Sequence, residues 1–581
     1  MKVSHFVAIC GLGLIVTLPV VILGVPLMSD DGVTHAMWYT HFSAQLWDGD
    51  LYPRWLMNMN AGLGSPVFFY YPPVPYFLTS LLRPFFSNDP QGLQQVGVSF
   101  SIALIASGIS AYSWLRETND QAFALVAALL YMVMPYHLAE IYIRGALAEH
   151  WAFVWMPLIL LFTQRIINGH RVAGVGLAIS YALLIMTHLP TALILSVVPI
   201  SYVLLTADKP MKIRVAGITV ASTLLGLGLA TVYILPAILT QQNVFISRMT
   251  TGYFSYENWF LFSKWSLWKD DKIMQLLLAA DMLAIACCSF IISKLRLDDS
   301  RQRINRFWFA AALTSVFMMT ELSKPLWWIV TVLRKIQFPW RFNVILCASV
   351  AALLALALSS LKRHSFGSVK LVKAVAILLI LVWIPAIAFE SWRVFPQTNP
   401  DWQTLNSKKK QLEQSRDAPE YRPRWNQSIA QLNWDASIDI DNWDNVLEKE
   451  FDSLLKSVTK AEGHAMPQVR ILEGSGQASM TVRRPREIDL HVETPTPALI
   501  EAPQFYYPNW TAQLLGETGR LTTTPSEPDG LVSFRVPQGN HDVQLRLDRS
   551  KSELAGQLIS LASLVVALCL TLYFAYFKRG L

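Results

Sequence analysis

The chain has 581 residues, of which 53% are hydrophobic and 15% are charged, and its mean hydropathy is +0.35. Soluble domains carry about 25% charged residues, so this composition excludes a soluble globular protein and indicates a membrane protein. The formal net charge of +7 does not predict a nucleic-acid partner, because most basic residues lie in short loops between apolar runs, where they orient a membrane protein.

The apolar runs predict a polytopic helical protein. A membrane-spanning helix needs about 20 apolar residues, and the first run lacks a small-x-small cleavage site, so we interpret it as an uncleaved anchor. About 12 runs qualify, near residues 6–27, 92–115, 121–137, 150–167, 172–188, 191–207, 214–239, 273–293, 306–320, 340–360, 370–389 and 555–577. With the N-terminus in the cytoplasm, every short basic loop falls on the same side, as the positive-inside rule requires. We therefore expect a multi-pass membrane protein with both termini in the cytoplasm.

The first outer loop follows directly on the first run and begins LMSDDGVTHAMWYTHF. Asp30 can cap a helix that begins near Gly32, but a cap does not account for the second carboxylate. Asp31 and His35 are four residues apart and would share one helix face. We expect Asp31 to face a cavity and to form a hydrogen bond with His35, and we expect Asp30 to be the cap.

The segment YYPPVPYFLTSLLRPFF (70–86) is apolar enough to suggest one more span. A span here would invert every later loop and place the basic clusters outside. The segment is also short, and its closely spaced prolines lack backbone donors. We interpret it as a re-entrant or interfacial segment on the outer face.

Polar side chains gather at the outer ends of later runs: Glu140, Arg144 and Glu149 in HLAEIYIRGALAEHW, His188 in MTHLP and Arg341 in RKIQFPWRF. Each also has a purely structural interpretation. Glu140 and Arg144 have the i,i+4 spacing of a helix ion pair, Arg341 could anchor at lipid headgroups, and His188 could be a buried core histidine. Together, carboxylates, imidazoles and guanidinium groups at one interface favour a site for an anionic, lipid-borne substrate.

Residues 391–553 are polar and would form a separate extracytoplasmic domain between a membrane domain (1–390) and a last membrane helix (554–581). The first part, 401–462, has a partly helical composition. The second part alternates apolar and polar residues between turns, as in ASMTVRRPREIDLHVET, and predicts an antiparallel β-sandwich over about 466–550. All five cysteines lie in apolar runs, so no disulfide framework is expected in this domain.

Several motifs together carry a family resemblance: DDGVTHAMWYTHFSAQLWDGDLYPRW, AGLGSPVFFYYPPVPYFL, RGALAEHW, THLP, QFPWRF and FYYPNW. They resemble the bacterial multi-pass family labelled 6-pyruvoyl-tetrahydropterin synthase-related membrane proteins. Nothing in them resembles the zinc histidines of a soluble pterin enzyme. The acidic first outer loop, the proline-bearing segment after it and the C-terminal outer domain are more widely similar to glycosyltransferases of the GT-C fold.

The GT-C resemblance implies an integral membrane glycosyltransferase that moves a sugar from a polyprenyl-phosphate donor to an envelope glycan, lipid or protein, with inversion, on the outer face of the inner membrane. Asp31 would be the general base, Asp30 its close rival, His35 its support and Glu149 a second carboxylate. The resemblance leaves open a divalent metal ion, Mg²⁺ or Mn²⁺, held by Asp31 and Glu149.

The remaining site residues follow from the same resemblance. Arg341, Arg144 and Arg54 would bind the donor phosphate, because a leaving phosphate needs cationic stabilisation. His188, Tyr71 and Glu140 would line the substrate cavity. Two other functions stay open: a transporter of lipid-linked glycans, which would need ionisable residues buried in mid-span, and a non-catalytic scaffold for envelope assembly, in which Asp31 would be dispensable.

Overall fold

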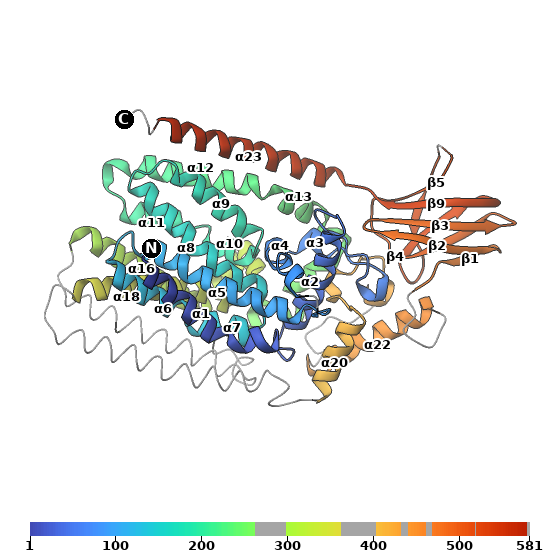
Figure 1. Cartoon of the computed structure of the whole chain (residues 1–581), viewed down its shortest axis with the longest axis horizontal. Coiled ribbons are helices and arrows are strands. Elements are labelled where there is room, and N and C mark those ends of the chain that lie inside the picture. Colours follow the sequence, from blue (N-terminus) through green and yellow to red (C-terminus); the bar gives the residue numbers. More distant parts are fainter. Residues whose placement is uncertain are drawn as a thin grey trace.

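The computed structural model describes residues 1–86, 88–261, 287, 298–361, 402–430, 440–459, 467–517 and 519–577. A bundle of helices forms one end of the molecule and two β-sheets form the other (Figure 1). The last helix, α23 (Lys551–Phe577), runs from the sheets back along the bundle. The chain therefore divides into a helical part and a sheet-bearing part, as the composition predicts.

The bundle is built around α5 (Leu93–Leu115), which packs against α1 (Val3–Leu23) on one side and α8 (Leu147–Ile167) on another. Gly97 permits the close approach of α1, because a Cβ atom there would collide with the carbonyl oxygen of Val20. The further helices of the bundle are α6 (Gln121–Met132), α7 (Pro135–Tyr142), α9 (Ala173–Ile185), α10 (Leu189–Leu195), α11 (Val198–Thr206), α12 (Lys212–Leu229), α13 (Thr231–Thr240), α16 (Asp299–Met319), α17 (Lys324–Ile329) and α18 (Asn343–Leu361).

Within the described residues, eight helices are long and apolar enough to cross a membrane. They are Val3–Leu23, Leu93–Leu115, Gln121–Tyr142, Leu147–Ile167, Leu189–Thr206, Lys209–Leu229, Pro339–Ser360 and Lys551–Phe574. These match eight of the predicted runs, which confirms a polytopic membrane protein. The runs 273–293 and 370–389 and the domain boundary near 391 lie outside the described residues, so the total of about 12 spans stays a prediction.

Two predicted spans differ from the structure. The run 172–188 becomes α9, which has 13 residues and is about 20 Å long at 1.5 Å per residue. That length falls short of the roughly 30 Å hydrocarbon core. Residues 306–319 of the run 306–320 belong to α16, a longer helix whose first half carries Asp299, Arg301, Arg303 and Arg306.

The segment 70–86 does not form a spanning helix, which confirms that part of the prediction. It is divided between α3 (Val67–Tyr70), α4 (Val74–Ser80) and a 3₁₀ turn at Arg83–Phe85. The prolines between and within these short helices remove the backbone donors that a continuous helix would use. The amide of Val74 instead donates to the carbonyl of Met186, 2.9 Å away, which attaches the segment to the bundle.

The polar domain, which we call the outer domain after its predicted side, begins with α20 (Trp402–Glu413), α21 (Gln427–Ala430) and α22 (Ile440–Thr459). Two antiparallel sheets follow, with strand orders β1-β4-β8-β7 and β2-β3-β9-β5-β6. The strands are β1 (Arg470–Glu473), β2 (Gln477–Arg484), β3 (Glu487–Thr494), β4 (Ala498–Phe505), β5 (Trp510–Leu514), β6 (Arg520–Leu521), β7 (Thr523–Pro525), β8 (Leu531–Val536) and β9 (Gly539–Leu547). Alternate residues of β3 are buried, as in a sandwich with one face against its core, so the predicted architecture is confirmed.

The outer domain rests on the first outer loop through the segment QFYYPNW. Gln504 accepts a hydrogen bond from Nε1 of Trp55 (2.8 Å) and donates to the carbonyl of Gly62 (2.6 Å). The hydroxyls of Tyr507 and Tyr70 are 2.8 Å apart. These contacts place the sandwich over the start of the bundle, where the residues after α1 lie.

Both termini lie at the end of the helical part away from the sheets (Figure 1). With the predicted orientation, the exposed Ser475 faces outward and the exposed Lys209 faces the cytoplasm. In a cysteine-free background on intact cells, we expect Ser475→Cys to react with a membrane-impermeant maleimide and Lys209→Cys to react only after the membrane is opened. The reverse pattern would contradict this topology.

Candidate functional site

The candidate site lies where the start of α2 (Gly32–Trp47) meets the turn before α8. The backbone amide of Asp31 donates to the carbonyl of Arg144 (2.8 Å), and that of Asp30 donates to the carbonyl of Ile143 (3.2 Å). Gly145 has a φ of +62°, and a Cβ atom there would lie 2.8 Å from the backbone nitrogen of Gly32. A glycine is therefore needed for this close approach, which brings Asp31 next to Arg144.

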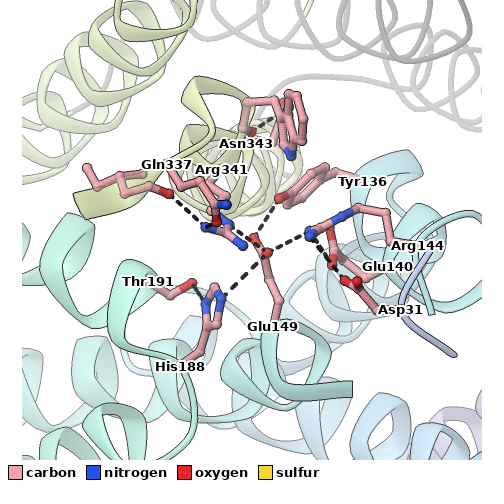
Figure 2. A network of polar contacts seen from close by, with 12 residues as sticks. Asp31, Tyr136, Glu140, Arg144, Glu149, His188, Thr191, Gln337, Arg341 and Asn343 are labelled. Atoms are coloured by element: carbon pink, nitrogen blue, oxygen red, sulfur yellow. Dashed lines mark hydrogen bonds and ion pairs between the residues drawn. The ribbon is translucent and has the colours of Figure 1, made fainter. Parts of the chain in front are cut away.

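Glu149, in the first turn of α8, is the centre of a buried polar network (Figure 2). Its Oε2 accepts hydrogen bonds from Nη1 of Arg144 (2.7 Å) and Nε of Arg341 (3.1 Å). Its Oε1 accepts one from the hydroxyl of Tyr136 (2.6 Å), and Nε2 of His188 lies 3.8 Å from Oε2. The structure thus brings together Glu149, Arg144, Arg341 and His188, all of which were predicted site residues.

The expected pair between Glu140 and Arg144 is also present. Nη1 of Arg144 lies 2.9 Å from both carboxylate oxygens of Glu140, and the Glu140 side chain is fully buried. Arg144 therefore serves two carboxylates at once. The expected ion pair is therefore present, but Arg144 lies two residues beyond the end of α7 at Tyr142, so the two residues are not paired along one helix. The pair belongs to the larger network and does not lie on a solvated face.

Exposure separates Asp31 from the other charged groups of the network. Its carboxylate is 48% exposed, whereas the side chains of Arg144, Glu140, Glu149 and Arg341 are at most 9% exposed. Oδ2 of Asp31 lies 3.8 Å from Nη2 of Arg144. The network thus has three carboxylates and two guanidinium groups, and the carboxylate that is open to solvent is Asp31.

Two predictions about the loop are wrong. The residue at the N-cap of α2 is Asp31 and not Asp30, and its side chain forms no capping hydrogen bond. Nδ1 of His35 lies 2.6 Å from the hydroxyl of Tyr76 instead of bonding to the Asp31 carboxylate. The link between Asp31 and His35 runs through the backbone, where the amide of His35 donates to the carbonyl of Asp31 (2.9 Å).

His35 turns toward Tyr76 because it is enclosed by aromatic rings. The rings of Trp38 and Tyr71 contact it edge-on at centroid distances of 5.8 and 5.9 Å. Burial lowers the pKa of His35 to about 4, against the opposing effect of the Asp31 charge. The imidazole is therefore neutral at pH 7, and it packs within an aromatic wall that includes Tyr71, a predicted cavity residue.

The outer domain places two acidic residues, Asp417 and Glu420, close enough to the candidate site for the charge of Asp31 to act on Glu420. The sequence analysis did not predict either residue. Oδ1 of Asp417 accepts a hydrogen bond from Nε1 of Trp38 (2.7 Å), and burial raises the pKa of Asp417 to about 6. Burial also raises the pKa of Glu420 to about 7, with a further contribution from the negative charges of Asp417 and Asp31. The polar stretch SRDAPEYRP contains both residues, but no spacing in the sequence indicates that this stretch lies near residue 31.

Arg54 does not join the network around Glu149, contrary to the prediction that it acts with Arg144 and Arg341. Its Nη2 donates to the carbonyl of Val232 (2.6 Å), and its Nε lies 3.4 Å from Oε1 of Glu553 at the start of α23. Arg54 therefore belongs to a second charged cluster, between the first outer loop and the last helix.

The donor set does not fit the metal ion that was predicted as an option. Both oxygens of Glu149 already accept hydrogen bonds from cations or from Tyr136. In the part of the chain that the structure describes, no three or more His, Cys, Asp or Glu side chains are grouped so as to hold a metal ion. As arranged here, the Glu149 carboxylate therefore serves Arg144, Arg341 and Tyr136.

The fold and the site define a polytopic membrane protein with a charged site at the ends of its helices, beneath a β-sandwich domain. Residues 68–396 match the family described as "6-pyruvoyl-tetrahydropterin synthase related domain; membrane protein". The match covers more than half of the chain, and the protein belongs to this family, which confirms the predicted resemblance. The matched range includes Tyr71, Glu140, Arg144, Glu149, His188 and Arg341, but ends before α20, the first described helix of the outer domain.

Two solved structures show a remote similarity. The arabinofuranosyltransferase AftD from Mycobacteria matches 68% of this chain with 13% identity and a TM-score of 0.42, over 28% of its own length. The oligosaccharyltransferase of Archaeoglobus fulgidus matches 77% of this chain with 13% identity and a TM-score of 0.41, over 60% of its own length. This chain thus spans less than two thirds of either protein. A search of curated protein sequences found no match.

Proposed function

We propose that this protein is a membrane glycosyltransferase that moves a sugar from a polyprenyl-phosphate donor to an envelope acceptor on the outer face of the inner membrane. The observation that carries the proposal is the exposed carboxylate of Asp31, 3.8 Å from Nη2 of a guanidinium group that buried carboxylates hold in place. A half-exposed base beside a fixed cation is what transfer to a nucleophilic acceptor, with a departing anion, requires.

The position of the site supports a lipid-borne substrate. Asp31 follows the span α1, and Glu149 lies in the first turn of the span α8. Both residues therefore lie at the ends of membrane-spanning helices, where a lipid headgroup and a water-soluble acceptor can meet. The charged groups of the network are gathered at this end, an arrangement that favours a reaction centre over a path of ionisable groups through the membrane.

The proposed reaction is an inverting transfer. The acceptor hydroxyl or amine gives its proton to the Asp31 carboxylate while its oxygen or nitrogen forms a bond to the anomeric carbon. The bond between that carbon and the phosphate oxygen breaks, and the electron pair leaves with the polyprenyl phosphate. Arg144 and Arg341 stabilise the negative charge on the phosphate. Glu149 and Glu140 hold both cations in position before the substrate arrives, so little reorganisation is needed.

Mass spectrometry of lipid-linked sugars and envelope glycans tests this proposal in cells. A strain that lacks the gene should lose one glycan modification and accumulate a sugar-bearing polyprenyl phosphate. Complementation with the wild-type gene should restore the modification, whereas Asp31→Asn expressed at the same level should not. Full restoration by Asp31→Asn would contradict the proposal and favour the scaffold. A donor that is sequestered in the inner leaflet of the deletion strain would favour the transporter.

A further inference from the structure

A second polar site lies apart from the Glu149 network, where the first outer loop, the sandwich and the start of α23 meet. It is a cavity of about 730 Å³ lined by residues of all three segments. Four of its lining residues are arginines: Arg54 from the loop, Arg486 from the turn before β3, and Arg546 and Arg549 from the end of β9 and the residues after it. The cavity therefore gathers cations that are distant in the sequence.

The inner wall of the cavity carries two guanidinium groups, one buried (Arg54) and one partly buried (Arg486), that share one carboxylate. Nε of Arg54 and Nη2 of Arg486 lie 3.4 and 3.1 Å from Oε1 of Glu553. Within the described residues, Nη1 of Arg54 and Nε of Arg486 are buried without a hydrogen-bond partner. A buried donor without a partner carries a desolvation cost, so these groups favour an additional anion in the cavity.

The rim adds two exposed cations. Arg546 is 62% exposed, and its ion pair with Asp548 is long, with 3.7 Å between Nε and Oδ1. The side chain of the exposed Arg549 forms no ion pair among the described residues. The lining carboxylates are Asp50, Glu487 and Glu553. Glu487 already binds a fifth arginine, Arg484, at 2.8 Å, and burial raises the pKa of Asp50. Positive charge is therefore in excess in the cavity.

The cavity opens beside an apolar, membrane-facing surface. Its lining residue Glu553 lies in the first turn of α23, a candidate span. Leu554 and Leu558, which follow on the same helix, are 46% and 67% exposed, and Leu51 on the cavity wall is 84% exposed. Acyl or prenyl chains can lie along such leucines while a headgroup enters the cavity, so the surface suits a lipid and not only a free anion.

We infer that this cavity binds the phosphate-bearing headgroup of a membrane lipid. The phosphate would accept hydrogen bonds from the guanidinium groups of Arg486, Arg546 and Arg549, and the lipid chains would lie against α23. The inference does not depend on the reaction at Asp31, because the two sites use different residues. The same chemistry would accept the phosphodiester of an anionic phospholipid or the phosphomonoester of a polyprenyl carrier.

Native mass spectrometry of the full-length protein in detergent tests the inference, with three lipid probes added separately: phosphatidylglycerol, undecaprenyl phosphate and zwitterionic phosphatidylcholine. The variant Arg546→Gln/Arg549→Gln removes two rim charges and leaves the buried Arg54 intact. Each arginine near a lipid surface is worth about 5-fold in affinity, so the variant should retain the bound anionic lipid about 25-fold more weakly. Arg535→Gln is the matched control, because Arg535 is an exposed arginine on the other sheet.

The outcomes separate the sources of the phosphate. Stronger retention of phosphatidylglycerol by the wild type and the control than by the double variant supports a phospholipid site. The same pattern with undecaprenyl phosphate supports a carrier-lipid site. The inference is overturned if the double variant retains both anionic probes as well as the wild type, or if phosphatidylcholine binds as tightly as they do.

Discussion

Asp31→Asn is expected to lower the turnover of the purified protein by about 10²–10⁴-fold, the usual contribution of a general base. The substitution keeps the size and the hydrogen-bonding capacity of the side chain but removes the group that accepts the proton. Because the Asp31 carboxylate is 48% exposed and its ion pair with Arg144 is long, at 3.8 Å, its loss should leave the fold intact. Turnover can be measured with a polyprenyl-phosphate sugar identified from the glycan analysis, and donor binding should change little.

Two neighbouring substitutions serve as controls for that experiment. Asp48→Asn removes an exposed carboxylate at the other end of α2 and should leave turnover unchanged. Asp30→Asn alters the adjacent residue, which is exposed and does not occupy the N-cap position, and should cost far less than Asp31→Asn. An inactive Asp30→Asn beside a fully active Asp31→Asn would reverse the assignment. If both variants are fully active, this loop is not the reaction centre.

Glu149→Gln is expected to destabilise the protein by about 3–5 kcal/mol, because it leaves a buried cation without its partner charge. Arg341 contacts Glu149 at 3.1 Å and otherwise donates to the carbonyl of Ile336 and the amide oxygen of Gln337. Arg144 keeps Glu140 after the substitution, so the main loss falls on Arg341. The free energy of unfolding can be followed by tryptophan fluorescence as a denaturing detergent is titrated against mixed micelles.

Glu117→Gln is the matched control for stability. Glu117 pairs at 2.9 Å with Arg165, whose side chain is 36% exposed, and such a pair is worth at most about 1 kcal/mol. The double variant Glu149→Gln/Arg341→Gln should lose less stability than the sum of the two single variants, since it removes the unpaired cation as well. Equal stability of Glu149→Gln and the wild type would contradict the central structural role of Glu149.

The membrane spans, the helical start of the outer domain and its β-sandwich could be predicted from the sequence because each depends on local patterns. Runs of about 20 apolar residues mark spans, and alternation marks strands with one buried face. The ion pair of Glu140 and Arg144 was visible from its i,i+4 spacing, although Arg144 lies just beyond the end of α7 and not on its face. The prolines of 70–86 likewise predicted a break, and the structure divides that segment into short helices.

The partners of the site residues were decided by the tertiary structure. Glu149 and Arg341 are 192 residues apart in the chain, and no periodicity connects them. The enclosure of His35 by Trp38, Tyr71 and Tyr76 directs its imidazole away from Asp31. Both outcomes follow from packing: a buried polar group takes whichever partner the surrounding elements bring within hydrogen-bond distance.

The same reason separates Arg54 from the cations with which it was grouped. A basic residue in an outer loop predicts an anion-binding role, and Arg54 does lie in a cluster with an excess of positive charge. Which cluster it joins depends on where the last helix returns to the first loop, because Glu553 and Val232 come from elements far along the chain. The sequence by itself determined which residue types carry charge at this surface. The three-dimensional packing of the helices against the outer domain decided how those charges divide into two sites.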